Sequence, residues 1–139
     1  MRRIQYDAIV QAVTDLCVDA AHRLSPDVLH ALQTATQSES DPRAAHVLKL
    51  LLENARVAET EQIPLCQDTG VAVVFIEQGN DVFVEGGLFE AVNEGVRRGY
   101  EQGYLRKSIV DDPIQKRENT GTNTPAVIAR SFRRSNLAY

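Results

Sequence analysis

The sequence predicts an α+β domain in which N-terminal helices precede a small β-sheet with one covering helix. Two observations lead to this prediction. Apolar residues recur at helical spacing from Ile9 to Ala58, and an almost uniformly apolar, β-branched run from Val71 to Ile76 then marks the first strand. The same order of elements leaves a mixed α/β arrangement open as the alternative. At 139 residues, we expect one domain over residues 1–139.

Three helices are expected in the N-terminal part of the chain. Ser25-Pro26-Asp27 predicts the start of the second, because it offers a cap, a proline at the first helical position and an acid in the first turn. A polar loop is expected from Thr36 to Ser40. Asp41-Pro42 repeats the start signal for the third helix. The apolar face of the first helix consists of Ile9, Val13, Leu16, Cys17, Ala20 and Leu24.

The middle of the chain changes from helical to strand-like patterning. The run from Val71 to Ile76 is typical of a strand that is buried on both faces. A turn at residues 77–81 and a short apolar segment, Val82 to Val84, favour a hairpin of two strands. Gly86-Gly87 ends this pattern, and a helix is expected from about Leu88 to Gly103.

A stripe of glycines lies along that last helix. Gly95, Gly99 and Gly103 follow one another at intervals of four and so share one face. Glycine inside a helix costs up to about 1 kcal/mol relative to alanine. We therefore expect this face to approach another backbone or a ligand closely, and a merely weak or broken helix is the alternative.

The C-terminal part is expected to be mostly loop from Arg106 to Pro125. Ala126-Val127-Ile128 predicts the start of a further strand. Residues 129–139 are basic, and we interpret them as an atypical tail without a strand partner.

Composition limits the classes of function. The hydrophobic fraction of 43% excludes a disordered chain, and the net charge of −4 argues against nucleic acid as a partner. No apolar run approaches the length needed to cross a bilayer, and Asp7 and Asp15 interrupt any export signal. The two cysteines predict free thiols in a cytoplasmic protein and are too few to hold an iron–sulfur cluster or zinc site alone.

The segment Ile63-Pro-Leu-Cys-Gln-Asp-Thr-Gly70 carries the densest chemistry. Its proline and glycine favour a loop held in a specific shape. Cys66 could serve there as a metal ligand, a nucleophile or a structural loop cysteine. A nucleophilic cysteine usually needs a histidine base, and the sequence places no histidine beside it.

Two later segments have both a structural and a functional interpretation. Asn119-Thr-Gly-Thr-Asn-Thr-Pro125 is either a surface turn or a group of hydrogen-bonding side chains around a polar ligand. Arg106 and Lys107 either end a helix in solvent or hold an acidic substrate, because arginine binds carboxylates through two parallel hydrogen bonds.

Taken together, four blocks occur in one order: Pro64-Leu-Cys-Gln-Asp-Thr-Gly70, Leu105-Arg-Lys-Ser-Ile-Val110, Asp112-Pro113 and Asn119-Thr-Gly-Thr-Asn-Thr-Pro-Ala-Val-Ile128. In this combination the chain resembles the N-terminal part of the class I fumarate hydratases and the related tartrate dehydratase α subunits, which are iron–sulfur hydro-lyases. The resemblance covers about residues 4–128.

The resemblance implies reversible hydration of a small dicarboxylic acid, fumarate/malate or tartrate. It also implies a [4Fe-4S] cluster held by three cysteines, of which Cys66 matches the first. Gln67 and Asp68 match residues that line the substrate site, and Arg106 matches an arginine that grips a substrate carboxylate. A surrounding active-site loop would contain Asn119, Thr120 and Asn123. We identify no candidate for the base that removes the carbon-bound proton.

The chain also departs from the family pattern. The family's other two cluster cysteines lie further along its sequence than this chain extends, and Cys17 matches neither. Thr122 and Ala129 stand where the family commonly has aspartate and often has histidine. The expected partners are therefore a β subunit or the remainder of an α subunit, in a homo- or hetero-oligomer. A non-catalytic truncated remnant or interaction module is the alternative to an enzyme.

Overall fold

The computed structural model describes residues 1–133. Helices come first and short strands follow, which confirms the α+β prediction, although one short strand precedes the first helix. The helix from Leu88 to Gln102 begins and ends as expected, with Gly103 as its C-terminal cap. In chain order the elements are β1 (Arg2–Ile4), α1 (Tyr6–His22), α2 (Pro26–Ser38), α3 (Pro42–Glu61), β2 (Val73–Gly79), β3 (Val82–Val84), α4 (Leu88–Gln102) and β4 (Val127–Arg133).

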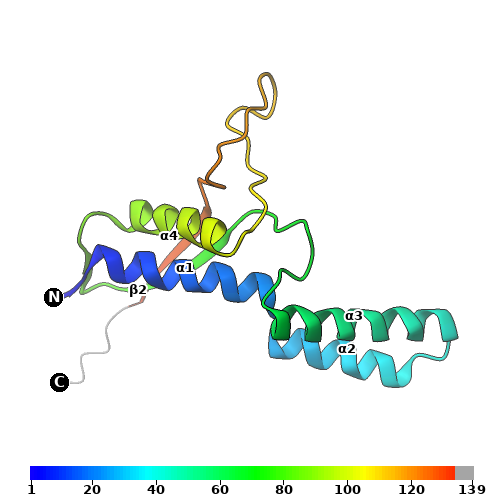
Figure 1. Ribbon diagram of the computed structural model, residues 1–139. Coiled ribbons are helices and arrows are strands. Elements are labelled where there is room, and N and C mark those ends of the chain that lie inside the picture. Colours follow the sequence, from blue (N-terminus) through cyan, green and yellow to red (C-terminus); the bar gives the residue numbers. More distant parts are fainter. Residues whose placement is uncertain (134–139) are drawn as a thin grey trace, which may run out of the picture.

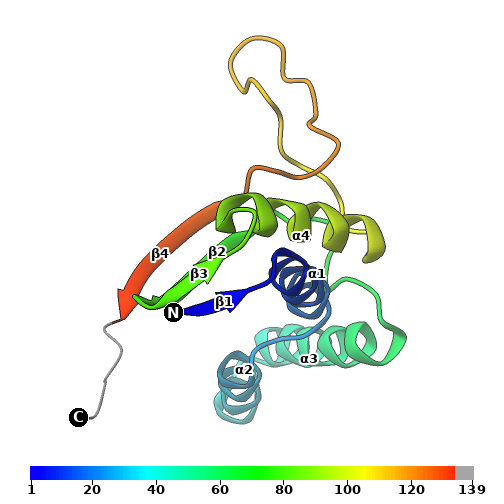
Figure 2. The ribbon, with the colours of Figure 1, turned by 90° about the vertical axis from the view of Figure 1, so that its left-hand side faces the viewer.

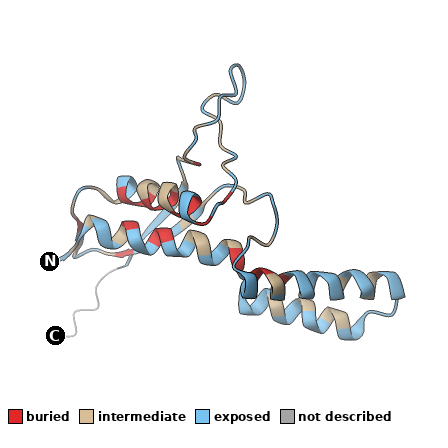
Figure 3. Cartoon of the chain, viewed as in Figure 1, coloured by how far each residue is buried: buried red, intermediate tan, exposed pale blue. Residues whose placement is uncertain are grey.

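The core lies where α1 and α4 run side by side (Figures 1 and 3). Val13, Val92 and Val96 are buried there. The glycine stripe makes this contact possible. A Cβ atom added to Gly95 would lie 2.6 Å from the Val13 Cβ, and one added to Gly99 would lie 2.6 Å from the Cys17 Cβ. The close-approach interpretation of the stripe is therefore confirmed.

The strands pair in parallel, and the expected hairpin is wrong. β2 pairs with β4, from Val73 opposite Val127 to Gly79 opposite Arg133. β3 pairs with β1 instead, with Arg2 opposite Val82. The packing of α1 on α4 brings the N-terminal strand β1 beside β3 (Figure 2). This contact joins residues that are distant in the sequence, so local sequence patterns do not predict it.

The strand β2 is buried on one face only, which corrects the prediction of burial on both faces. Val74 and Ile76 pack against the core, whereas the Phe75 side chain between them is 82% exposed. No helix or strand among residues 1–133 covers the outer side of the β2–β4 pair, at the left of Figure 2. The apolar run from Val71 to Ile76 therefore predicted the strand correctly but did not predict that one of its faces is exposed.

Helices α2 and α3 form a hairpin that extends to one side of the body (Figure 1). The Asp41 side chain caps α3 by accepting hydrogen bonds from the backbone amides of Arg43 and Ala44, as its sequence position predicts. The expected loop at 36–40 is corrected in part, because α2 continues to Ser38. Most residues of this hairpin are exposed (Figure 3).

The predicted tail also needs correction. Residues 129–133 continue β4 and pair with β2, so this part of the segment has a strand partner. Residues 134–139 lie outside the described part of the chain. Within residues 1–133, no helix is both long and apolar enough to span a membrane.

The close contact of α1 and α4 predicts a cost for any side chain at Gly95. In Gly95→Ala, the added methyl group would also lie 2.8 Å from the Val10 carbonyl oxygen, which is backbone and cannot rotate away. We expect the free energy of unfolding to fall by about 1–3 kcal/mol in urea denaturation. Helix propensity alone would change it in the opposite direction by up to about 1 kcal/mol.

The matched control is Gln102→Ala, at an exposed position of the same helix, where little change is expected. A Gly95→Ala variant as stable as the parent chain would show that the two helices do not pack as described.

Candidate functional site

The loop between α3 and β2 is held in place from several directions. It leaves α3 at Gln62, which has a left-handed backbone conformation with φ of 53°. The backbone amide of Leu65 donates to the Ala21 carbonyl, and the Asn54 side chain donates to the Leu65 carbonyl. The Asp68 carboxylate accepts from the Gly70 amide at 3.2 Å and so closes a tight turn. Cys66, Gln67 and Asp68 thus stand exposed on a fixed loop.

A second segment, which follows α4, lies against this loop. The Arg106 guanidinium donates from Nη1 to Gln67 Oε1 at 2.8 Å, and the Arg106 carbonyl accepts from the Thr69 hydroxyl at 2.7 Å. These residues border an open pocket of about 460 Å³. Its lining is Pro64, Cys66, Gln67, Thr69, Tyr104 and Arg106. The thiol and amide of the neighbouring residues Cys66 and Gln67 therefore meet the distant Arg106 guanidinium at one pocket.

Asn123 ties the two segments together beneath the pocket. Its side chain is fully buried, with 0% exposure. Its Oδ1 accepts from the backbone amides of Ser108 and Ile109, at 2.7 and 3.1 Å, and its Nδ2 donates to the Gly70 carbonyl at 3.1 Å. Asn123 thus holds the two segments in position through buried hydrogen bonds. It does not line the pocket.

The remaining loop candidates also make local contacts outside that lining. Asn119 is exposed, accepts from the Gly121 amide and donates to the Lys107 carbonyl at 2.8 Å. The Thr120 amide donates to the Ile109 carbonyl. These bonds join the two sides of the long loop between α4 and β4. The structure therefore brings Cys66, Gln67 and Arg106 to one pocket, lets Asn123 brace the segments beside it, and leaves Asn119 and Thr120 in contacts within the long loop.

Tyr100 is a site-supporting residue that the sequence analysis missed. It is buried in α4, and its hydroxyl donates to the carbonyls of Thr69 and Gly70 at 3.0 and 3.3 Å. Burial raises the pKa of this hydroxyl above its ordinary value, which keeps it protonated as a donor. Its spacing of four residues from Val96 could have indicated a buried position, but periodicity does not report where a hydroxyl points.

The two cysteines differ in environment. Cys17 packs between α1 and α4, and burial raises the pKa of its thiol to about 11. Cys66 is exposed, and its Sγ lies 3.0 Å from the Asp68 carbonyl oxygen. No histidine is among the residues that line the Cys66 pocket, so those residues offer no imidazole base for a thiol nucleophile.

Among residues 1–133, Cys66 is the residue best suited to bind an iron–sulfur cluster. Cys66 presents an accessible sulfur, the donor that iron–sulfur clusters use. Residues 1–133 contain no group of three or more cysteine, histidine or acidic side chains positioned to hold a metal ion. Residues 1–133 can thus supply one thiolate ligand to a cluster, which is too few to hold the cluster without further ligands.

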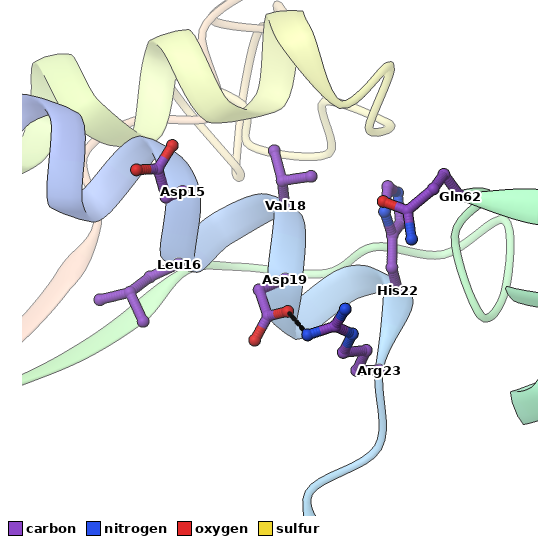
Figure 4. A pocket seen from close by; sticks show the side chains of 7 residues that line it. All are labelled: Asp15, Leu16, Val18, Asp19, His22, Arg23 and Gln62. Carbon is purple, nitrogen blue, oxygen red and sulfur yellow. Dashed lines mark ion pairs between the residues drawn. The ribbon is translucent and has the colours of Figure 1, made fainter. Parts of the chain in front are cut away.

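A separate pocket of about 440 Å³ lies at the C-terminal end of α1 (Figure 4). Asp19 and Arg23 form an ion pair at 3.1 Å on its wall, and His22 lies beside Gln62. His22 is buried, and neither ring nitrogen has a hydrogen-bond partner among the described residues. Because both nitrogens are enclosed by other atoms, the imidazole does not offer them to a ligand in this pocket.

Comparison with known proteins decides the family. The profile of the family described as fumarate hydratase (fumerase) matches residues 10–137. The chain belongs to the fumarate hydratase family. It is 35% identical over 123 residues to the putative L(+)-tartrate dehydratase subunit alpha of Methanocaldococcus jannaschii, covering 86% of this chain and 43% of that protein. It is 31% identical over 132 residues to the anaerobic class I fumarate hydratase of Escherichia coli K12, covering 91% of this chain and 23% of that protein.

Two consequences follow from the fumarate hydratase family match. The chain spans less than half the length of these relatives. The match also runs to residue 137 and so includes most of the segment from 129 onward.

Asn123 is expected to be the most sensitive of the loop residues. Asn123→Ala leaves two backbone amides and one carbonyl without their buried partner, and we expect the free energy of unfolding to fall by about 2–3 kcal/mol. The comparison is Asn119→Ala, whose freed backbone groups can turn to water, with an expected loss of about 1 kcal/mol or less. Equal losses in urea denaturation would contradict the structural role of Asn123.

The thiols are expected to react in a fixed order. At about pH 8, only about 0.1% of a thiol with a pKa of about 11 is ionised, and thiolate is the reactive form. Iodoacetamide should therefore modify exposed Cys66 first and Cys17 only after denaturation, as followed by peptide mass spectrometry. Modification of both thiols at one rate in the folded protein would contradict the burial of Cys17.

Proposed function

We propose that this chain forms part of an iron–sulfur hydro-lyase that reversibly hydrates a small dicarboxylic acid, fumarate/malate or tartrate. The family membership supports the reaction class. The observation that carries the proposal is the meeting of Cys66, Gln67 and Arg106 at one open pocket. Each is a residue that the family resemblance connects with cluster or substrate.

Each group has a chemical task that suits its position. Arg106 would hold a substrate carboxylate, and its hydrogen bond to Gln67 fixes the direction of the guanidinium. The resemblance also connects Asp68 with the substrate site; it lies outside the lining of this pocket, and its carboxylate accepts from the Gly70 amide in the neighbouring turn. Cys66 would supply one thiolate to a [4Fe-4S] cluster. An iron centre at such a site supplies Lewis acidity toward a substrate oxygen.

We further propose that activity needs more polypeptide than these 139 residues. One cysteine among the described residues suits a cluster, and the Methanocaldococcus relative is named as an alpha subunit, which implies a partner subunit for that protein. We call the part of that alpha subunit outside its match with this chain the completing polypeptide. A reducing cytoplasm is the proposed location, because an exposed free thiol such as Cys66 persists there.

The test is to produce the chain together with the completing polypeptide and a β-type subunit, and to reconstitute the complex anaerobically with iron and sulfide. We expect bound iron and hydration of fumarate or dehydration of tartrate in the parent complex. Cys66→Ser should lower both bound iron and turnover by at least about tenfold, because metal binding needs the thiolate.

Cys17→Ser is the matched control, because it removes the other thiol without touching the pocket. It should retain iron and activity. Equal iron and turnover in the Cys66→Ser complex would contradict the assigned ligand. An iron-free, inactive parent complex would favour the non-catalytic module.

A further inference from the structure

Tyr104 ends α4 in an unusual backbone conformation. Its amide donates to the Glu101 carbonyl at 3.3 Å, and the Leu105 amide donates to the Tyr100 carbonyl at 3.0 Å. These two bonds form a Schellman motif, with Gly103 as the C-cap and Tyr104 in the left-handed position that follows it, at φ of 52°. Glycine usually occupies this position, because a Cβ atom makes the left-handed conformation unfavourable. The chain therefore has a strained tyrosine where glycine would fit without strain.

Packing within residues 1–133 does not explain this tyrosine. Tyr104 is 93% exposed, and its hydroxyl makes no hydrogen bond with another residue of that range. Tyr100, four residues earlier, is instead buried, and its hydroxyl has backbone partners. Strained residues cluster at active sites and ligand clamps, where the surrounding structure holds them for a function. The backbone of Tyr104 thus points to a role for its side chain outside the fold.

The position of Tyr104 suggests what that role is. Tyr104 lines the same pocket as Cys66, Gln67 and Arg106. Three other non-glycine residues among 1–133 have left-handed backbones, and none of them lines this pocket: Gln62, Arg117 and Asn123. The strained tyrosine therefore stands where the proposed substrate binds.

The other polar side chains that line this pocket already have a partner or a task. Gln67 Oε1 accepts from the Arg106 guanidinium, and the Thr69 hydroxyl donates to the Arg106 carbonyl. Arg106 suits a carboxylate, because a guanidinium only donates hydrogen bonds. Cys66 is the proposed cluster ligand. Among the described lining residues, the Tyr104 phenol is thus the hydroxyl left to pair with a substrate hydroxyl, because it can both donate and accept.

Malate and tartrate differ at one hydroxyl group. Both carry the hydroxyl that leaves on dehydration, and tartrate carries a second one. We propose that Tyr104 is a specificity-determining residue whose phenol binds the second hydroxyl of a dihydroxy dicarboxylic acid such as tartrate. This proposal rests on the proposed function. Hydrogen bonding to a substrate hydroxyl discriminates against the analogue that lacks this hydroxyl.

The test uses the complex of this chain with the completing polypeptide and a β-type subunit, reconstituted with iron and sulfide. We expect the parent complex to dehydrate tartrate with a higher kcat/KM than malate. Tyr104→Phe removes the hydroxyl and keeps the ring and the left-handed backbone. It should lower kcat/KM for tartrate at least about fivefold and leave kcat/KM for malate unchanged.

Tyr6→Phe is the matched control. It removes a phenol hydroxyl near the opposite end of α4, where Tyr6 donates to the Glu90 carbonyl at 3.3 Å. Both kcat/KM values should stay at those of the parent complex. Equal losses for tartrate and malate in Tyr104→Phe, or no loss for either acid, would overturn the role of Tyr104.

Tyr104→Gly tests whether the strained position serves the ligand. Because glycine adopts φ of 52° without a steric cost, the urea midpoint of the free chain should rise above that of the parent. The assembled variant should at the same time lose its preference for tartrate. A higher midpoint with the tartrate preference intact would overturn the proposal, and a midpoint at or below that of the parent would contradict the strain on which it depends.

Binding without turnover separates this proposal from the proposed function. In the iron-free complex, the parent should bind tartrate with a lower Kd than malate in titration calorimetry, and Tyr104→Phe should bind both acids equally. That result, in a complex that never holds iron or dehydrates either acid, would leave the role of Tyr104 standing and overturn the proposed function. A parent complex that binds tartrate no more tightly than malate would overturn the role of Tyr104, even if the reconstituted complex holds iron and is active.

Discussion

The arrangement of the whole molecule depends on the close approach of α1 to α4. Gly95 and Gly99 let the α4 backbone reach the Val10 and Thr14 carbonyls of α1, and the Thr14 hydroxyl donates to the Gly95 carbonyl at 3.1 Å. This contact carries β1 to β3 and sets the inner layer for β2 and β4. It also positions Tyr100, one turn beyond Val96, beneath the Thr69–Gly70 turn. A packing contact between helices thus fixes the base of a polar site.

The site itself depends on short polar contacts between segments that are distant in sequence. Arg106 meets Gln67, Thr69 meets the Arg106 backbone, and Asn123 meets Gly70. The Arg106–Gln67 and Thr69–Arg106 bonds are exposed, whereas the Asn123 side chain is buried, so leaving its groups unpaired would be costly. These contacts hold the exposed Cys66 and Gln67 on a loop of defined shape.

Two features of residues 1–133 are an exposed sheet face and an exposed thiol. The Phe75 side of the β2–β4 pair lacks a covering layer among residues 1–133, and the Cys66 loop offers one thiol. The chain spans less than half the length of the relatives it matches.

The sequence by itself determined the type of every described element except β1, the cap at Asp41, the close approach implied by Gly95 and Gly99, and the polar block from Cys66 to Thr69. These are local properties of spacing, backbone freedom and residue chemistry. The tertiary structure decided which strands pair, that Phe75 faces outward, and that Asn123 and Tyr100 support the site rather than line it. Strand pairing and side-chain direction arise from contacts across long stretches of chain. A pattern of neighbouring residues carries no information about which distant surface it will meet.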